Sequence, residues 1–195
     1  MSRAEKKDSP TMTRFTLRTA ALATVFTLGA FAAHAENPMV GGAPMYAEKN
    51  IVENAVNSKD HTTLVAAVKA AGLVDTLKSP GPFTVFAPTN NAFAALPAGT
   101  VDTLLKPENK GTLTTVLTYH VVPGKLDAAA LMNMIKDGNG SATLKTAAGG
   151  NLIAKSAGGK VMITDEKGGT ATVTIADVYQ SNGVIHVVDK VLLPK

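Results

Sequence analysis

FTVFAPTNNAF, which runs from Phe83 to Phe93, holds the only three phenylalanines that follow residue 35, and the chain has no tryptophan. Side chains alternate across a strand, so Phe83 and Val85 are predicted to point to one face and Phe86 to the other. Large aromatic rings contribute much of the area of the core that they join. We therefore predict a core strand buried on both faces. The alternative, a surface aromatic patch for a ligand, is less typical of such a run.

A short helix is predicted to follow this strand. Pro88 ends the strand, because proline cannot donate to the hydrogen-bond ladder of a sheet. Thr89 has the side chain of a helix N-cap. Phe93 and Leu96 would then share one face of the helix. This stretch thus predicts a buried strand and a capped helical turn.

The first 35 residues have the pattern of a secretory signal peptide. Arg14 and Arg18 precede an apolar run over 19–33, and a small-x-small ending predicts cleavage after Ala35. The apolar run is shorter than the ~20 residues that a membrane-spanning helix needs. Met12 is an alternative start, because the segment before it is long and charged for the beginning of a signal peptide.

The charge of the chain resides largely in that leader. The whole sequence has 19 Lys and Arg against 15 Asp and Glu, of which five basic and two acidic residues precede residue 36. The remainder has 14 basic and 13 acidic residues, and all 14 basic ones are lysines. Nucleic-acid binders usually show a basic excess and use arginine on phosphate and guanine. We therefore expect no nucleic-acid partner.

Residues 36–195 are expected to reach the periplasm or the medium. Their length suits one domain with its own core. Residues 36–48 are rich in Gly and Pro and are predicted to be a flexible leader, so that the domain covers 49–195. The chain has no cysteine, which excludes disulfides, thiolate nucleophiles, cysteine metal sites and a lipid anchor on an N-terminal cysteine. We expect a monomer that does not insert into a membrane.

Helical patterns fill the first half of this region. The segment 51–77 is predicted to be helical with Gly72 as a stop, and its apolar face would carry Leu64, Val65, Val68 and Ala71. A short helix over 101–105 would have Thr100 as its N-cap. Further helices are predicted around 113–117 and over 128–137, the last one capped by Asp127 and ended by Gly138.

Strand patterns follow from residue 141. TATVTI alternates strictly, with Ala171, Val173 and Ile175 on one face, which is typical of a half-buried strand. The alternation breaks at Ala176-Asp177 and predicts a bulge or bend there. SNG at 181–183 is a turn signal, and the apolar run VIHVVDKVLL predicts a central strand. Helices before strands predict an α+β fold with an antiparallel sheet.

Three of these stretches resemble, in order and spacing, the motifs of fasciclin domains. FTVFAPTNNAFAALP resembles the first homology motif, LTYHVVPGKL the Tyr-His motif and NGVIHVVDKVLLP the second homology motif. The resemblance covers 49–195 and implies a wedge of two mostly antiparallel β-sheets with N-terminal and lateral α-helices. It identifies the chain as similar to small secreted bacterial members, periostin and the transforming-growth-factor-β-induced protein. Motif residues with an expected structural role are Phe83, Phe86, Thr89, Phe93, Tyr119, His120, Asn182, Gly183 and His186.

Candidate catalytic and metal-binding residues are few. His61, His120 and His186 have neither the close spacing of a metal site nor a cysteine partner. We expect His120 and His186 to be buried, hydrogen-bonded core residues, a reading that the structural Tyr-His pair of the family supports. A Ser-His-Asp triad is compatible with the composition, but no Gly-x-Ser-x-Gly motif supports one. We expect no enzyme, no catalytic residue, no metal and no cofactor.

Asp177 and Val178 form the candidate partner-binding pair. In animal fasciclin domains, an Asp-Ile pair before the second homology motif is implicated in integrin binding, and the resemblance places it here. The alternative is an Asp at a strand bulge whose carboxylate accepts a local hydrogen bond. We expect the carboxylate to face the interior.

Two functions are consistent with these patterns. The first is a non-enzymatic adhesion or protein-interaction module that binds a cell-surface or matrix protein or glycan. The second is a periplasmic protein that binds a small ligand or glycan in a cleft between helices and sheet. A deep apolar pocket would favour the second function, and a filled core with a flat polar face would favour the first.

Overall fold

One long sheet organises the molecule. The computed structural model describes residues 37–195; the expected signal peptide, its cleavage site and the alternative start at Met12 lie outside the described residues. Seven strands hydrogen-bond in the order β4-β3-β9-β8-β7-β6-β5. Their bounds are β3 Phe83–Pro88, β4 Val121–Pro123, β5 Ser141–Lys145, β6 Asn151–Ala157, β7 Lys160–Thr164, β8 Thr170–Gln180 and β9 Gly183–Val188. All neighbours are antiparallel except β3 and β9, which are parallel.

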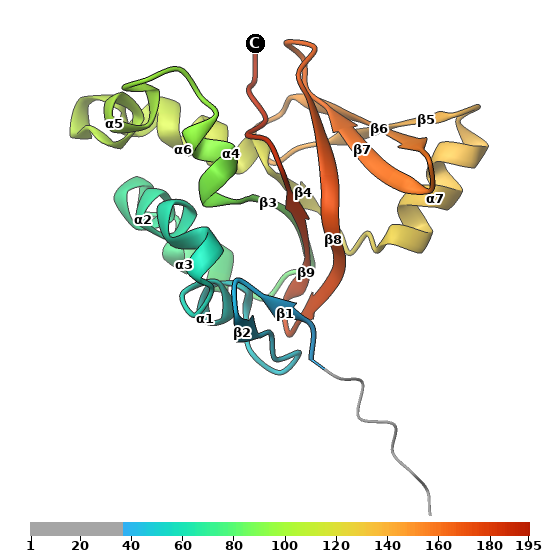
Figure 1. Cartoon of the computed structure of the whole chain (residues 1–195), viewed down its shortest axis with the longest axis horizontal. Coiled ribbons are helices and arrows are strands. Elements are labelled where there is room, and N and C mark those ends of the chain that lie inside the picture. The colour runs from blue at the N-terminus through green and yellow to red at the C-terminus, as the bar shows by residue number, and fades with distance from the viewer. Residues whose placement is uncertain (1–36) are drawn as a thin grey trace, which may run out of the picture. The chain divides into compact units, whose positions relative to one another are not determined.

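Strand β8 joins two arms of this sheet. Its pairing with β9 shifts register between Val173 and Ile175 and again between Ile175 and Val178. Asp177 lies within the second irregularity with a φ of 58°, in the left-handed region. The bulge predicted at Ala176-Asp177 is therefore confirmed. The arm β5–β7 and the arm β4-β3-β9 meet at β8, which is the arrangement that a wedge of two mostly antiparallel sheets requires (Figure 1).

Helices pack on both arms (Figure 1). Six α-helices gather beside β3 and β9, and α7 packs against β5 and β6. Their bounds are α1 Ile51–Ala55, α2 Thr62–Ala71, α3 Val74–Lys78, α4 Asn90–Ala94, α5 Thr100–Leu105, α6 Lys110–Tyr119 and α7 Ala128–Asp137. Two 3-10 turns, η1 Lys59–His61 and η2 Pro107–Asn109, lead into α2 and α6. The predicted α+β fold with helices before most of the strands is confirmed.

Local signals set several helix ends as predicted. The Asp127 carboxylate accepts a hydrogen bond from Ala130 N at 2.7 Å and caps α7, which ends before Gly138. Gly72 ends α2 with a φ of 74°. Thr89 caps α4 by accepting from Ala92 N. Thr100, however, is the first residue of α5 and not its cap, because the left-handed Gly99 occupies the N-cap position.

The long helix predicted over 51–77 is divided into α1, η1, α2 and α3. Polar residues with low helix propensity interrupt it after Ala55, where the Asn57 side chain donates to the Glu53 carbonyl. Gly72 then separates α2 from α3. The predicted apolar face is present, with Leu64, Val68 and Ala71 buried and Val65 half-buried.

The described part of the expected flexible leader, residues 37–48, is packed on the domain. It forms a two-stranded antiparallel sheet from β1 Met39–Val40 and β2 Ala43–Pro44. Val40 and Met45 are buried in the core. The expectation was wrong for these residues, because two apolar side chains find a buried place between α1 and the sheet that composition does not reveal.

Strand β3 divides the core as its alternation predicts. Val85 and Ala87 join the cluster under α1–α6, whereas Phe86 joins the cluster between α7 and the arm β5–β7. The strand is buried on both faces, with only Phe83 partly exposed. The Phe83–Phe93 stretch therefore lies at the boundary between two cores.

Candidate binding site

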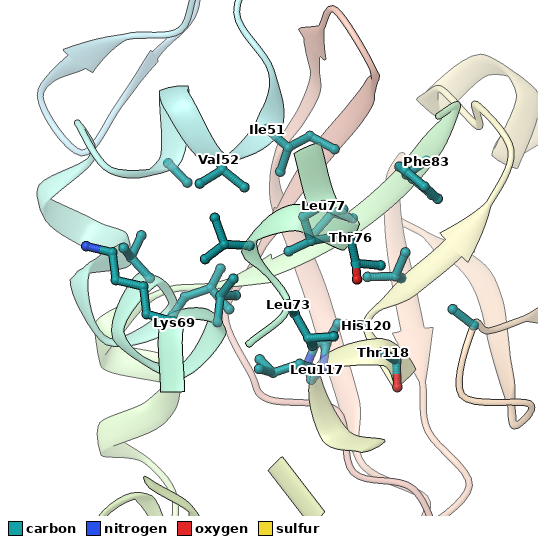
Figure 2. A pocket seen from close by; sticks show the side chains of 18 of the residues that line it. Ile51, Val52, Lys69, Leu73, Thr76, Leu77, Phe83, Leu117, Thr118 and His120 are labelled. Atoms are coloured by element: carbon teal, nitrogen blue, oxygen red, sulfur yellow. The ribbon is translucent and has the colours of Figure 1, made fainter. Parts of the chain in front are cut away.

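An apolar cavity lies between the helices and β3 (Figure 2). Its volume is about 90 Å³, and it is lined by residues of α1, α2, α3, α6, β3 and β4. Lys69 and Thr76 at its rim are exposed, and Leu73 and Val74 are half-buried. Ala147, which also lines the cavity, is exposed as well, so the cavity reaches the surface. Figure 2 shows the Lys69 amine directed away from the other side chains.

The cavity follows from the short helices that surround it. Helices α1 and α3 have five residues each, and their inward side chains are Ile51, Val52 and Leu77. Phe83 supplies the only phenylalanine ring on this side of β3, because the Phe86 ring packs in the other core; the imidazole of His120 also lines the cavity. Aliphatic side chains of this size leave a gap that a larger ring would fill.

His120 lies in the wall of the cavity but offers it no free nitrogen. Its Nδ1 lies 2.8 Å from the Val116 carbonyl, and its Nε2 accepts from Leu192 N at 2.9 Å. This pair of bonds requires the neutral ring with the proton on Nδ1. Burial lowers the His120 pKa to about 4, with the Val116 carbonyl opposing that shift. The ring fastens α6 to the C-terminal segment.

Tyr119, the last residue of α6, connects the end of this helix to the arm β5–β7. Its ring is fully buried, and its hydroxyl donates to Asn151 O at 2.7 Å and accepts from Glu166 N at 3.1 Å. A Cβ at Gly150 would lie 2.7 Å from the Tyr119 ring, so only glycine fits there. The Tyr119-His120 pair thus joins α6 to both arms of the sheet.

Asn182 and Gly183 tie the β8–β9 turn to the helices. The Asn182 side chain accepts from Ile51 N at 3.1 Å and donates to Leu77 O at 2.7 Å. A Cβ at Gly183 would lie 2.0 Å from the Phe83 carbonyl oxygen, which excludes any other residue at this close crossing of strands. These contacts fix the positions of α1 and α3, and therefore two walls of the cavity.

His186 is fully buried and stacks on Phe86 at 5.7 Å between ring centroids. Its Nε2 lies 2.7 Å from the Leu126 carbonyl, and its Nδ1 lies 3.4 Å from Asp177 N. Burial lowers its pKa, with the Leu126 carbonyl opposing that shift. The structure therefore places His120 and His186 in separate polar networks.

The Asp177-Val178 pair is divided between surface and core. The Asp177 carboxylate is partly buried and accepts from Ala128 N, the first residue of α7, at 2.6 Å. Val178 is 1% exposed and packs in the core cluster under the helices. Its side chain therefore has no access to a partner. Asp177 instead supplies a second carboxylate, beside Asp127, at the positive end of the α7 dipole.

Comparison with known proteins places this architecture in a family. The family model for the fasciclin domain matches residues 59–194. The chain belongs to the fasciclin domain family. Protein sll1483 of Synechocystis is 51% identical over 159 residues, covering 82% of this chain and 81% of that protein. Immunogenic protein MPB70 of Mycobacterium bovis is 37% identical over 145 residues, covering 72% of this chain and 66% of that protein.

A solved fasciclin-domain structure has the same fold. The FAS1 domain pair of the insect cell adhesion molecule fasciclin I superposes with a TM-score of 0.67 at 18% identity, covering 74% of this chain and 51% of that one. Fasciclin domains typically serve in adhesion or protein interaction. Residues 37–195 contain no helix long and apolar enough to cross a membrane.

The sequence raised a cleft between helices and sheet as one of two functional alternatives, but it indicated neither the position nor the lining of the cavity. The apolar residues of 51–77 join the core, but they do not fill it. The only signal was the absence of aromatic residues from that segment. Within residues 37–195, no cluster of three histidine or carboxylate side chains could hold a metal ion.

Proposed function

We propose that this fasciclin-domain protein is an exported, non-enzymatic interaction module that attaches to a cell-surface or matrix protein. A deep apolar pocket would have favoured the small-ligand function, but the apolar cavity between helices and sheet has a volume of only about 90 Å³. The observation that carries the proposal is this small cavity, whose exposed lining includes residues of α2 and α3. Its mouth is the place where an apolar side chain of a partner can leave water completely. Anchors of this kind, placed in desolvated pockets, carry most of the energy of protein interfaces.

The size of the cavity supports a side-chain anchor. Its volume of about 90 Å³ is well below the ~300–1,000 Å³ of pockets that enclose whole drug-sized ligands. It is also smaller than the ~150 Å³ engineered cavity that holds benzene. One aliphatic or small aromatic group of a larger partner fits this space better than a complete molecule of that class. The apolar lining makes a glycan a poor occupant, because sugar hydroxyls would lose their hydrogen bonds with water.

The Asp177-Val178 pair is the weaker candidate site. Val178 is buried, and the Asp177 carboxylate already accepts a hydrogen bond from α7. A partner that used both side chains would have to open β8. The cavity mouth requires no such opening.

A substitution that fills the mouth tests this proposal. Val74 is half-buried and lines the cavity, whereas Val56 is exposed and lies outside it. The partner is first captured from surface and matrix extracts with residues 36–195, then purified and titrated against each variant. We expect Val74→Phe to weaken binding by about thirtyfold or more, the effect of removing a hot-spot pocket. Val56→Phe is the matched control and should bind like the wild type. Equal affinity of both variants would exclude the cavity as the interaction site.

A second function, binding of a small apolar ligand, is favoured by one specific observation. Behind the first cavity lies a second one of about 30 Å³, and Ile51, Ala55, Leu64 and Val85 line both. The two cavities are therefore neighbours, separated by these shared side chains. Native mass spectrometry of protein purified from its own cells, followed by organic extraction, would detect a bound apolar molecule. Recovery of unliganded protein would argue against this function.

A further inference from the structure

Strand β5 forms one edge of the seven-stranded sheet, and two of its residues direct their backbone groups outward (Figure 1). Thr146 N donates to Gly150 O at 2.9 Å, and the antiparallel pairing of β5 with β6 continues in the same register. Hydrogen-bonded pairs alternate along an antiparallel ladder, so Leu144 bonds to β6, whereas Thr143 and Lys145 point their N–H and C=O groups away from it. This edge therefore presents the donors and acceptors that one further strand would use.

The opposite edge of the sheet, β4, is poorly suited to such pairing. The Val121 carbonyl already accepts from Ala147 N at 2.7 Å, and Pro123 has no N–H to donate. A groove of about 610 Å³ borders the outward edge of β5, and its lining includes residues of β4, β5 and α7. Of the two edges, β5 is therefore the one that offers both free backbone groups and adjoining space.

The groove gives this edge an apolar side. Val122 and Leu144 are buried in its lining, Leu126 is half-buried, and Met134 is 37% exposed. Successive side chains of a strand point to opposite faces of a sheet, so every second side chain of an added strand would point to the Leu144 face and reach the groove. Methionine is flexible and polarizable and can adapt to such side chains.

The other face of this arm is basic. Its positions on β5, β6 and β7 carry three lysines, Lys145, Lys155 and Lys160, and no Asp or Glu. Glu166, which follows β7, has its carboxylate engaged with Asn151 N at 3.0 Å. Pairing of β5 with the same strand of a second copy would bring two basic faces side by side, and a lysine on an edge strand is a common device against such pairing. A strand with carboxylates on this face would instead meet opposite charge.

We propose that β5 binds an extended segment of a partner protein in which carboxylate and apolar side chains alternate. The segment would lie antiparallel to β5 and exchange backbone hydrogen bonds with Thr143 and Lys145. Its carboxylates would lie on the basic face, and its apolar side chains would enter the groove beside Leu126 and Met134. In this mode of recognition, main-chain bonds supply affinity and the alternate side chains supply specificity. The site goes beyond the function proposed for the helical cavity, with which the groove shares Ala147 as a lining residue.

The test titrates residues 36–195 with synthetic peptides of about eight residues, long enough to cover a typical strand, and follows backbone amide and methyl resonances by NMR. We expect a peptide of alternating glutamate and valine to shift the Thr143 and Lys145 amides and the Met134 methyl group in a saturable manner. Glutamates on the basic face would point their N–H groups at β5, so N-methylation of the glutamates should weaken binding by about tenfold or more. N-methylation of the valines is the matched control and should have little effect. A peptide with lysine in place of glutamate should bind about tenfold more weakly than the acidic one.

Two substitutions in β5 test the edge and its charge separately. Thr143→Pro removes an N–H that β6 does not use and should weaken the acidic peptide about tenfold, whereas Thr143→Val retains that N–H and should bind like the wild type. Lys145→Glu should weaken the acidic peptide and strengthen the lysine peptide. Lys106→Glu, at an exposed lysine that ends α5, is the matched control and should alter neither.

The outcomes separate strand addition at β5 from binding at the helical cavity. Absence of a saturable shift, or equal affinity of the two methylated peptides, would overturn the site. Broadening of the β5 amides with protein concentration alone would make a second copy the occupant and would overturn it as well. Val74→Phe, which tests the cavity, should leave peptide binding unchanged, so that the two proposals fail independently. The methylated peptides decide the matter on the wild type even if Thr143→Pro does not fold.

Discussion

The two cores of this domain differ in how completely their side chains fill the available space. Between α7 and the arm β5–β7, Phe86, Tyr119, Leu131, Leu152 and Ile163 are fully buried. Under α1–α6, most core residues retain a few per cent of exposure, and two apolar cavities lie among them. Well-packed cores supply stability and a single native structure, whereas unfilled space forfeits dispersion contacts. The α7 side is therefore the more completely filled core, and the space into which a partner or ligand could insert lies on the helical side.

The largest effect is expected at Phe86, which fills the α7 side of β3. Phe86→Ala should lower the free energy of unfolding by about 3–5 kcal/mol, because it leaves a ring-sized void beside His186. Chemical denaturation measures this directly. An unchanged midpoint with lost ligand binding would show that the two cores have been assigned the wrong roles.

The second largest effect is expected from acidification, which should lower the free energy of unfolding through His120, the histidine between the two cores. The folded pKa of His120 is lowered to about 4 from 6.5, so the unfolded chain binds a proton more readily between these values. Stability is therefore fully present above pH 6.5 and falls as the pH drops toward 4, by about 3 kcal/mol from this group. Burial lowers the pKa of His61 and of His186 as well, and both act in the same direction.

Denaturation of the wild type and of His120→Gln at pH 7 and pH 4.5 isolates the contribution of this ring. Glutamine retains a donor and an acceptor but does not titrate. The variant should lose less stability on acidification than the wild type. Equal pH dependence would place the acid sensitivity elsewhere.

Substitution of Asp177 should have an intermediate effect on stability. Its carboxylate bonds β8 to the first residue of α7 and is not packed in the centre of either core. Asp177→Ala removes the acceptor for Ala128 N and should cost about 1–3 kcal/mol. Asp177→Asn is the matched control, since it keeps an acceptor oxygen and tolerates the positive φ of 58°. Unchanged stability of the alanine variant with loss of cell attachment would restore Asp177 as the adhesion residue.

Sequence patterns predicted the secondary-structure elements on the α7 side more accurately than the packing on the helical side. The alternation of Phe83–Pro88, the cap at Asp127 and the break at Ala176-Asp177 are local signals, and each element formed where its signal lay. The burial of Val40 and Met45 depends on a space between distant elements, which composition cannot show.

The volume and lining of the cavity could not be predicted from the sequence, for a related reason. Unfilled volume depends on how far apart the short helices are held by contacts such as those of Asn182 with Ile51 and Leu77. The sequence of α1 and α3 specifies apolar faces but not the distance between them.

The smallest effect is expected on the rim of the cavity. Leu73 is half-buried and lines the space, so its truncation enlarges a void that already exists and removes few contacts. Leu73→Ala should therefore cost about 1 kcal/mol or less, below the ~2–5 kcal/mol that is usual for leucine in a filled core. Leu131→Ala, on the fully buried α7 side, is the matched substitution and should reach that range. Denaturation curves of the two variants test the difference in packing between the cores. Equal losses would mean that the helical core is as tightly packed as the other, and the cavity would then have no surplus volume for a partner or ligand.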